Sequence, residues 1–165
     1  GRVLATRVRE LGQGDTTASL SPILADDGAA LLREVLPGYL RGDVTPQPQD
    51  DERATWCRTV TKADGAIDWH RPVAAIERHI RAMHEWPGAW TTWAGRRLVV
   101  RQAGIVPGPS NGSPGVVQVR DNAVTVSTGD GVLALQVVQA EGRGPVDAAA
   151  FARGQRTLNG AVLGA

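Results

Sequence analysis

The sequence predicts a mainly β fold with flanking helices, built around a small Greek-key barrel that follows an N-terminal helical segment. Three observations lead to this fold class. Apolar residues recur with a period of two over much of residues 89–139, a proline-rich acidic stretch separates that part from a helical pattern, and a short helical pattern closes the chain. The 165 residues are 42% hydrophobic and 21% charged, which allows a real core in one ordinary domain or in a small domain with an appendage.

Residues 1–40 contain the first helical pattern. An apolar stretch at residues 3–8 is a candidate strand, and one of residues 15–17 is placed to cap the helix that follows. Pro22 is expected near the first turn, and Pro37 with the glycine after it is expected to end the helix. A helix this apolar requires a partner surface, which the chain barely supplies. The apolar residues at near-helical spacing are Leu20, Ile23, Leu24, Leu31, Leu32, Val35 and Leu36.

The sequence of residues 41–53, RGDVTPQPQDDER, differs in composition from both of its neighbours. It contains two prolines, four acidic residues and no large apolar residue except Val44. This composition predicts an extended linker at a domain boundary. The predicted organisation is therefore an N-terminal segment at 1–40, a linker at 41–53 and a C-terminal domain at 54–165.

The C-terminal domain is predicted to begin with a helix that starts at a proline and covers about residues 72–83. Ile76 and Ile80 share one face of this helix. Arg78 and Arg81 lie on the opposite side. The helix should therefore bury its apolar face and expose its arginines.

After this helix, turn sequences separate five short candidate strands, which predict a small barrel of the oligonucleotide-binding type. A flexible loop is expected at residues 107–114. A closing helix is expected at residues 148–153, opened by Asp147 or Pro145 and ended by Gly154. The strands are expected at residues 89–93, 97–103, 115–120, 123–127 and 132–139.

No complete active site is predicted within these residues. His70, His79 and His84 lack the spacing of a shared metal site, so no metal is expected. Cys57 is interpreted as a buried structural thiol, and a single cysteine excludes an internal disulfide. No apolar run approaches the ~18 residues that a membrane helix needs. The chain starts with neither Met nor a signal peptide, so we expect it to be a piece of something larger.

Five tryptophans fall between residues 56 and 93, in a chain with one Phe and one Tyr. Such residues either stack nucleic-acid bases or pack helices onto a barrel. We expect Trp69 and Trp86 to pack in the core. Both alternatives stay open for Trp90 and Trp93, with packing the favoured one.

The net charge of +1 conceals an asymmetry along the chain. Residues 1–55 carry 6 Arg and 9 acidic residues, a net charge of −3, whereas residues 56–165 carry 12 Lys and Arg and 8 acidic residues, a net charge of +4. Arginine binds phosphate through a bidentate, weakly hydrated fork, so the excess indicates an anionic partner. A GC-rich genome would produce the same arginine bias with no functional cause.

One basic surface is predicted on the C-terminal domain. Alternate residues of a strand face the same side, so Arg97 and Arg101 would lie together. Arg96 in the hairpin turn and the two helical arginines, Arg78 and Arg81, would extend this surface. It would bind phosphates without reading sequence, and the alternative is a solvated charged face. A further cluster near the C-terminus comprises Arg143, Arg153 and Arg156.

Several motifs along nearly the whole chain resemble the methionyl-tRNA formyltransferases. The most specific motifs are ATWC at residues 54–57, TKADGAIDW at 61–69 and IRAMHEWPGAWT at 80–91. The hairpin at 95–98, the sequence GDGVL at 129–133 and the closing stretch at 148–154 match the same pattern in the same order.

The resemblance implies a larger, two-domain enzyme. Members of the family transfer a formyl group from 10-formyltetrahydrofolate to the amino group of methionine on initiator tRNA. A Rossmann-like α/β core holds the formyl donor and the catalytic Asn, His and Asp, and a barrel of the oligonucleotide-binding type contacts the tRNA. Residues 1–40 would then be a strand and helix remnant of that core, beginning just after the last catalytic residue. No residue of this chain is expected to be catalytic or to bind the formyl donor.

The resemblance also implies partners and a binding surface. The partners would be initiator methionyl-tRNA and the missing N-terminal core, in a monomeric cytoplasmic enzyme without membrane contact. The residues expected to bind tRNA are Arg58, Lys62, Arg78, Arg81, Arg96, Arg97, Arg101 and Arg143.

The sequence departs from the family pattern at three points. Thr59 stands where the family usually has Lys, the pair His84-Glu85 where it has Asn-Pro, and Gly144 reduces a basic pair in a late loop. Each departure weakens the inferred tRNA surface or passes its role to a neighbour such as Arg58. Two other interpretations stay open: a free-standing barrel that binds nucleic acid, and part of a formyltransferase that acts on an amino sugar or another small amine.

Overall fold

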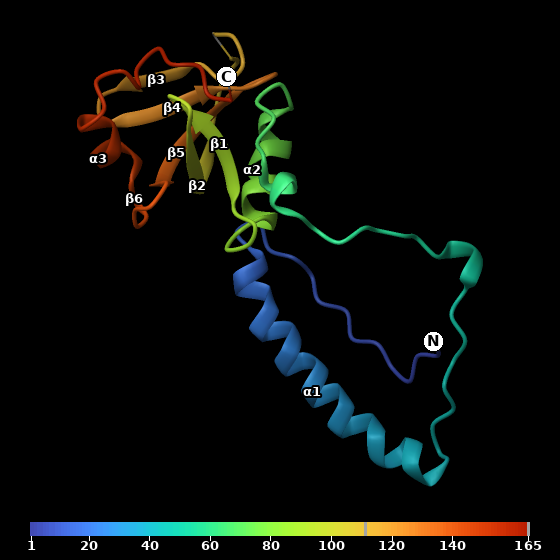
Figure 1. Cartoon of the computed structure of the whole chain (residues 1–165). Coiled ribbons are helices and arrows are strands. Elements are labelled where there is room, and N and C mark those ends of the chain that lie inside the picture. The colour runs from blue at the N-terminus through green and yellow to red at the C-terminus, as the bar shows by residue number, and fades with distance from the viewer. Residues whose placement is uncertain (111, 165) are drawn as a thin grey trace. The chain divides into compact units, whose positions relative to one another are not determined.

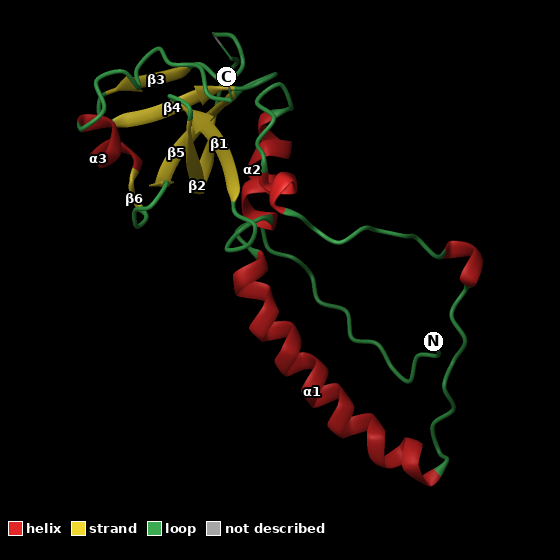
Figure 2. Ribbon diagram, viewed as in Figure 1, coloured by secondary structure: helices red, strands yellow, loops and turns green. Residues whose placement is uncertain are grey.

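The computed structural model describes residues 1–110 and 112–164. The chain divides into two compact units, Gly1–Thr59 and Val60–Ala165, and each is described by itself. Figure 1 follows the chain through both units, and Figure 2 shows their helices and strands.

The main element of the first unit is the helix α1, which spans Thr17–Arg41. Thr16 caps its start: the Thr16 hydroxyl accepts the backbone N–H of Ser19, and the Ser19 hydroxyl accepts the backbone N–H of Thr16. The helix ends where Gly42 takes a left-handed conformation with φ of 86°. Glycine adopts this conformation without a steric penalty, so Gly42 supplies the stop.

The expected end of this helix at Pro37 is wrong, because both Pro22 and Pro37 lie inside α1. A proline inside a helix removes one backbone hydrogen bond and tends to kink or break the helix, but here the chain stays helical to Arg41. The carbonyls of Gly38 and Tyr39 instead accept the backbone N–H of Gly42, which completes the last turn.

The segment that precedes α1 is held by charged side chains and one backbone bridge. Arg9 Nε donates to a carboxylate oxygen of Asp27 at 2.7 Å. This hydrogen bond and the charge of Arg9 hold the pKa of the Asp27 carboxyl below its ordinary value. Where a strand was expected at residues 3–8, the structure forms only an isolated bridge, in which Val3 and Gln47 exchange backbone hydrogen bonds of 2.9 and 2.8 Å.

The helix α1 buries none of its own residues among those described in the first unit. This agrees with the expectation that its apolar face needs a partner surface. The large apolar side chains that it leaves exposed are Ile23, Leu24, Leu32, Leu36, Tyr39 and Leu40.

Over the described residues of the second unit, six strands form one antiparallel sheet in the order β1-β2-β5-β4-β3, with β6 paired to β5. Consecutive hairpins join β3, β4 and β5, and β2 returns to lie beside β5, which is the Greek-key arrangement. The predicted fold class is confirmed. The strands are β1 (Ala89–Trp93), β2 (Arg96–Val106), β3 (Val117–Arg120), β4 (Ala123–Ser127), β5 (Val132–Ala140) and β6 (Val146–Asp147).

The end of the chain closes this sheet into a barrel. The backbone N–H of Val117, on the outer edge of β3, donates to the carbonyl of Ala161 at 2.8 Å. Three residues further along, the N–H of Gly164 donates to the carbonyl of Thr92, on the outer edge of β1, at 2.9 Å. One short segment thus bonds to both open edges of the sheet and removes them from solvent.

Two helices cover the barrel, as Figure 1 shows. The helix α2 (Val73–Ala82) packs on β2 and β5 and buries Ile76 and Ile80, as its apolar pattern predicts. The helix α3 (Ala148–Arg153) packs on β4 and β5, is capped by Asp147 and ends at Gly154. Two short 3₁₀ turns, η1 (Asp51–Arg53) and η2 (Lys62–Gly65), precede α2.

Apart from shifts of one residue, the observed strands differ from the expected ones in three places. The strand β2 extends to Val106, and β3 begins only at Val117, after Gly115 takes a left-handed conformation with φ of 85°. The two-residue strand β6 was not expected, because it is too short to show a period of two. Asn111, within the loop expected at residues 107–114, lies outside the described residues.

Two burial predictions are wrong and one is confirmed. Trp69 is 3% exposed, and its indole N–H donates to the Thr91 hydroxyl at 3.0 Å. Trp86 is instead 57% exposed, in the turn between α2 and β1. Cys57 is also exposed, because the segment around it packs against no core. No helix of the described chain is long and apolar enough to cross a membrane.

The start of α2 depends on one long-range cap. Pro72 occupies the N-cap position and supplies no capping side chain, and Asp130 accepts the backbone N–H of Val73 at 2.7 Å instead. Replacement of Asp130 by Ala should lower the free energy of unfolding by about 0.5–2 kcal/mol, the usual cost of a lost cap. Urea denaturation of the purified chain measures this difference.

The variant Asp130→Asn is the matched control, because its amide oxygen can still accept the Val73 N–H. It should lose less stability than Asp130→Ala. Equal stability of Asp130→Ala and the unmodified chain would contradict the role of this cap.

Candidate nucleic-acid interface

Trp90 forms the floor of a basic surface on the outer side of β1 and β2. It lies opposite Val99 in the antiparallel register. Its indole N–H donates to the Lys62 carbonyl at 2.9 Å, and the guanidinium carbon of Arg97 lies 4.7 Å from the centre of its ring. A cation in this position is attracted to the ring face by about 0.5–2 kcal/mol, depending on exposure. The ring therefore fixes the position of the Arg97 charge.

The close approach of the chain at Gly65 keeps Trp90 in place. A Cβ atom at Gly65 would lie 2.9 Å from Cδ1 of Trp90 and would overlap the carbonyl oxygen of Gly88. Only glycine allows this approach, so η2 packs directly against β1. The turn that contains Lys62 and Gly65 thus contacts Trp90 and helps to hold its ring in the basic surface.

Arg101 is held by a side chain from the neighbouring strand. Its Nε and Nη2 atoms both donate to Oε1 of Gln139, on β5, at 2.9 and 2.6 Å. The amide nitrogen of Gln139 donates to the Arg143 carbonyl at 2.7 Å. One glutamine therefore ties the Arg101 guanidinium to the turn that follows β5.

A β-bulge determines where Arg101 points. The β2–β5 register pairs Val100 with Val138 and Gln102 with Val137, so Arg101 has no partner residue of its own. An extra residue of this kind bends the strand and changes which side chains face outward. The outer face of β2 thus carries Arg97 and Arg101, as the alternation predicted.

Arg97 and Arg101 line one hollow of about 210 Å³ with Gln139 and Glu141. Nη2 of Arg97 also donates to the Pro87 carbonyl at 3.4 Å. Both guanidinium groups are partly buried, but each keeps donors that none of these contacts uses. The hollow is therefore suited to an anionic group.

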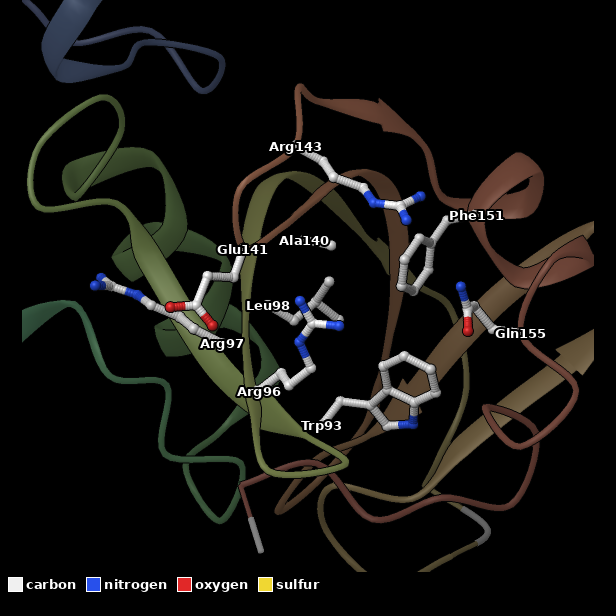
Figure 3. A pocket seen from close by; sticks show the side chains of 9 residues that line it. All are labelled: Trp93, Arg96, Arg97, Leu98, Ala140, Glu141, Arg143, Phe151 and Gln155. Carbon is white, nitrogen blue, oxygen red and sulfur yellow. The ribbon is translucent and has the colours of Figure 1, made fainter.

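Arg96 lies on the opposite face of β2 from Arg97 and lines a second hollow, together with Arg143 (Figure 3). Consecutive strand residues point to opposite sides, yet Arg97 also borders this second hollow, so the grouping of Arg96 with Arg97 stays a prediction. The two hollows are neighbours, since Arg97, Ala140 and Glu141 line both.

The remaining predicted residues are placed differently. Arg81 pairs with Glu77 at 2.6 Å on α2, so its charge is largely satisfied within the helix. Arg78 is exposed on α2, and Lys62 is exposed in η2, where only its carbonyl contacts Trp90. Arg58 is part of the first unit. The described structure thus brings together Arg96, Arg97, Arg101 and Arg143.

Sequence reasoning missed Gln139 and Phe151. A glutamine at an outward strand position has no distinctive pattern, and only the β2–β5 register shows that it meets Arg101. Phe151 packs edge-to-face on Trp93, with ring centres 5.7 Å apart and an interplanar angle of 77°. Phe151 stands out in the sequence as the single Phe of the chain, but the sequence does not show that its ring packs on Trp93.

The arrangement offers guanidinium donors that an anion could accept. Among the described residues, no three His, Cys, Asp or Glu side chains are grouped so that they could hold a metal ion. The His70 imidazole lies 3.3 Å from a carboxylate oxygen of Asp68, in an exposed turn. Fixed guanidinium groups beside an aromatic ring and an amide are typical of surfaces that bind phosphate groups.

The fold is a β barrel that carries arginine side chains on both faces of β2. Comparison with known families gives the more specific assignment: the chain belongs to the formyl transferase C-terminal domain family, whose model matches residues 59–156.

Curated relatives extend the match beyond that domain. The methionyl-tRNA formyltransferase of Roseiflexus castenholzii is 41% identical over 165 residues, which cover 99% of this chain and 53% of that protein. That of Solibacter usitatus is 38% identical over 164 residues, which cover 99% of this chain and 52% of that protein. The chain therefore spans about half the length of the curated relatives it matches.

Solved structures support the fold. A HypX variant from Aquifex aeolicus matches with a TM-score of 0.68 and 23% identity over 94% of this chain and 28% of that one. HypX solved in complex with tetrahydrofolic acid matches with a TM-score of 0.67 and 23% identity over 92% of this chain and 27% of that one. At this identity the likeness shows the fold alone.

The role of Trp90 can be tested without a ligand. Replacement of Trp90 by Leu removes the ring under Arg97 and the hydrogen bond to Lys62, and should lower the free energy of unfolding by about 1–3 kcal/mol. Urea denaturation followed by circular dichroism measures the loss. In the same variant, the Nε–H signal of Arg97 in NMR spectra should report a more mobile side chain.

The control is Trp56→Leu, because Trp56 is 96% exposed. Its stability and the Arg97 signal should match those of the unmodified chain. If Trp90→Leu leaves the Arg97 signal unchanged, Trp90 does not position that guanidinium.

Proposed function

We propose that this chain is the C-terminal part of a methionyl-tRNA formyltransferase, and that its barrel binds the tRNA through the arginines of β2. The observation that carries the proposal is the pair Arg97 and Arg101, held side by side by Trp90 and Gln139. The curated relatives that match this chain along almost its whole length carry the name of that enzyme.

The fixed guanidinium groups support phosphate binding on physical grounds. A free arginine loses side-chain entropy when it orders on a ligand, at about 0.5–1.5 kcal/mol for each immobilised side chain. Arg97 and Arg101 are already ordered by Trp90 and Gln139, so this loss is reduced. Phosphate contacts position a nucleic acid without reading its sequence, which suits a domain that holds the body of a tRNA.

The proposed division of labour places the chemistry outside this chain. Attack of an amine on a formyl group requires a proton acceptor and donors for the developing oxyanion. We assign these groups, and the site for 10-formyltetrahydrofolate, to the N-terminal core of the intact enzyme. The barrel would supply binding energy far from the reacting atoms and orient the methionyl end of initiator tRNA towards that core.

The domain boundaries belong to the same proposal. Residues 1–40 would be the last part of the formyltransferase core, residues 41–53 the linker and residues 54–165 the tRNA-binding domain. The apolar face of α1 supports this, because the described residues leave it exposed and a core would cover it. We further propose a monomeric enzyme that acts in the cytoplasm without contacting a membrane and without a metal.

Four of the eight residues of the predicted binding set have a direct place in this proposal. Arg97 and Arg101 would contact phosphates on the outer face, and Arg96 and Arg143 line the adjoining hollow. Lys62 supports Trp90 through its carbonyl, and Arg81 is engaged by Glu77. Arg78 and Arg58 are proposed to contribute long-range attraction, since exposed charges raise the local concentration of a polyanion.

The two alternatives predict different ligands. An amino sugar is small and would not require two ordered guanidinium groups on the outside of a barrel. A free-standing barrel would leave the apolar residues of α1 exposed to water, which independent soluble proteins rarely do. Measurements of tRNA binding and of formylation distinguish both alternatives from the proposed function.

The test is formylation of methionyl-tRNA by the intact protein that contains this chain. The variants Arg97→Gln and Arg101→Gln should each raise KM for tRNA about 5- to 20-fold, because each removes one charge-assisted hydrogen bond to a phosphate. The slope of log K against log salt should fall by about one unit for each arginine–phosphate pair that is removed. The turnover number should change less than KM, since neither residue touches the reacting atoms.

The matched control is Arg120→Gln, which removes an equal charge from an exposed position at the end of β3. Its KM should rise less than twofold. Unchanged kinetics of both β2 variants would refute the assignment of this surface. Absence of tRNA binding at low salt, together with formylation of a small amine, would favour the amino-sugar alternative.

A further inference from the structure

The second hollow, at the open end of the barrel, combines aromatic rings with unsatisfied donors. Figure 3 shows it between the β1–β2 turn, the turn after β5 and α3. It measures about 90 Å³ and continues into an adjoining hollow of about 230 Å³, with Arg143 and Phe151 lining both. We call this the mouth pocket, and the side chains that matter in it are Trp93, Arg96, Arg143, Phe151 and Gln155.

The two rings of the mouth pocket are held rigidly but remain partly exposed. Trp93 and Phe151 meet edge-to-face at 5.7 Å, which fixes both orientations. Both pack against the barrel core on one side and reach the pocket on the other. Aromatic surface of this kind at a rim is suited to the face of a flat, unsaturated ring.

Three polar side chains of the mouth pocket have no side-chain partner among the described residues. Among the described residues, none forms a hydrogen bond or ion pair with the guanidinium of Arg96 or Arg143, or with the side-chain amide of Gln155. Arg97 and Arg101 differ, because Trp90 and Gln139 engage them. Within the described chain, the pocket therefore presents two cations without a partner, one amide that can both donate and accept, and the carboxylate of Glu141.

We propose that the mouth pocket binds one unstacked nucleotide of the RNA held by the barrel. The base packs against Trp93 and Phe151, Gln155 contacts its edge, and Arg96 and Arg143 bind the adjacent phosphate. This inference rests on the proposed RNA binding and assigns a second, base-specific contact to it. The nucleotide is unpaired, because a base within a duplex cannot leave its stack to meet the rings.

The position of the mouth pocket beside the β2 surface supports this proposal. Arg96 and Arg97 are consecutive residues that face opposite sides of β2, and both line the pocket region. A strand of RNA that follows Arg101 and Arg97 along the outer face reaches Arg96 at the hairpin turn. Glu141 lines the mouth pocket and also the hollow on the outer face, so its carboxylate borders both groups of arginines.

Two RNA probes of equal phosphate number separate the mouth pocket from the β2 surface. The probes are a short oligoadenylate, whose bases are unpaired, and a blunt RNA duplex. Phe151→Leu in the protein that contains this chain should weaken binding of the oligoadenylate about 5- to 100-fold, the usual value of one stacked base. It should leave duplex binding unchanged. Arg101→Gln should weaken both probes to the same extent.

Because Phe151 also packs against the core, Arg143→Gln supplies a variant that preserves packing. It should weaken oligoadenylate binding more than duplex binding. Equal effects of Phe151→Leu and Arg143→Gln on the two probes, or no effect of either, would overturn the proposal.

A direct probe keeps this proposal separate from tRNA binding. Titration with adenosine 5′-monophosphate should shift the indole N–H signal of Trp93 in NMR spectra, and ribose 5-phosphate should shift it less. The variant Trp93→Phe assigns the signal. If adenosine 5′-monophosphate shifts the Trp93 signal but neither RNA binds, the mouth pocket is supported and the proposed function is refuted. If adenosine 5′-monophosphate does not shift the Trp93 signal, the mouth pocket alone is overturned.

Discussion

The pairing of β2 with β5 is the constraint on which the rest of the second unit depends. It joins the β1–β2 hairpin to the β3–β4–β5 meander, and so creates the Greek-key order. It also places Gln139 within reach of Arg101, and a bulge in the same ladder leaves Arg101 without a paired residue. A slip of one residue in this register would exchange the buried and exposed faces of β2. The barrel core and the basic surface are therefore determined by the same set of hydrogen bonds.

The four arginines that line the two hollows fall into two groups that differ in how far they are ordered. Arg97 and Arg101 are held by an aromatic ring and an amide, whereas Arg96 and Arg143 reach into the mouth pocket without a partner among the described residues. An ordered cation binds a phosphate with little further loss of entropy, and a free cation can adapt to a ligand of variable position. This difference fits the two proposals, in which the outer face of β2 holds the RNA backbone and the mouth pocket receives a single base.

Much of the fold was predictable because its determinants are local. The apolar face of α2, the capping of α3 by Asp147 and the five main strands all follow from periodicity and turn residues within short windows. The errors have equally specific causes. Pro37 did not end α1, because Gly42 supplies the left-handed residue that a stop requires. Trp86 is exposed although tryptophan usually packs inside, and it lies in the turn between α2 and β1.

The candidate site was predictable only in its residue types. The sequence by itself determined the excess of arginine after residue 55, the outward pairing of Arg97 with Arg101 and the pattern that resembles the formyltransferases. Only the tertiary structure decided that Gln139 meets Arg101, that Trp90 lies under Arg97 and that Phe151 joins Trp93 at the mouth of the barrel. These contacts join residues 7 to 58 positions apart in the chain. Their geometry depends on strand register and barrel closure, which arise from the packing of the whole unit and leave no signal in any local stretch of sequence.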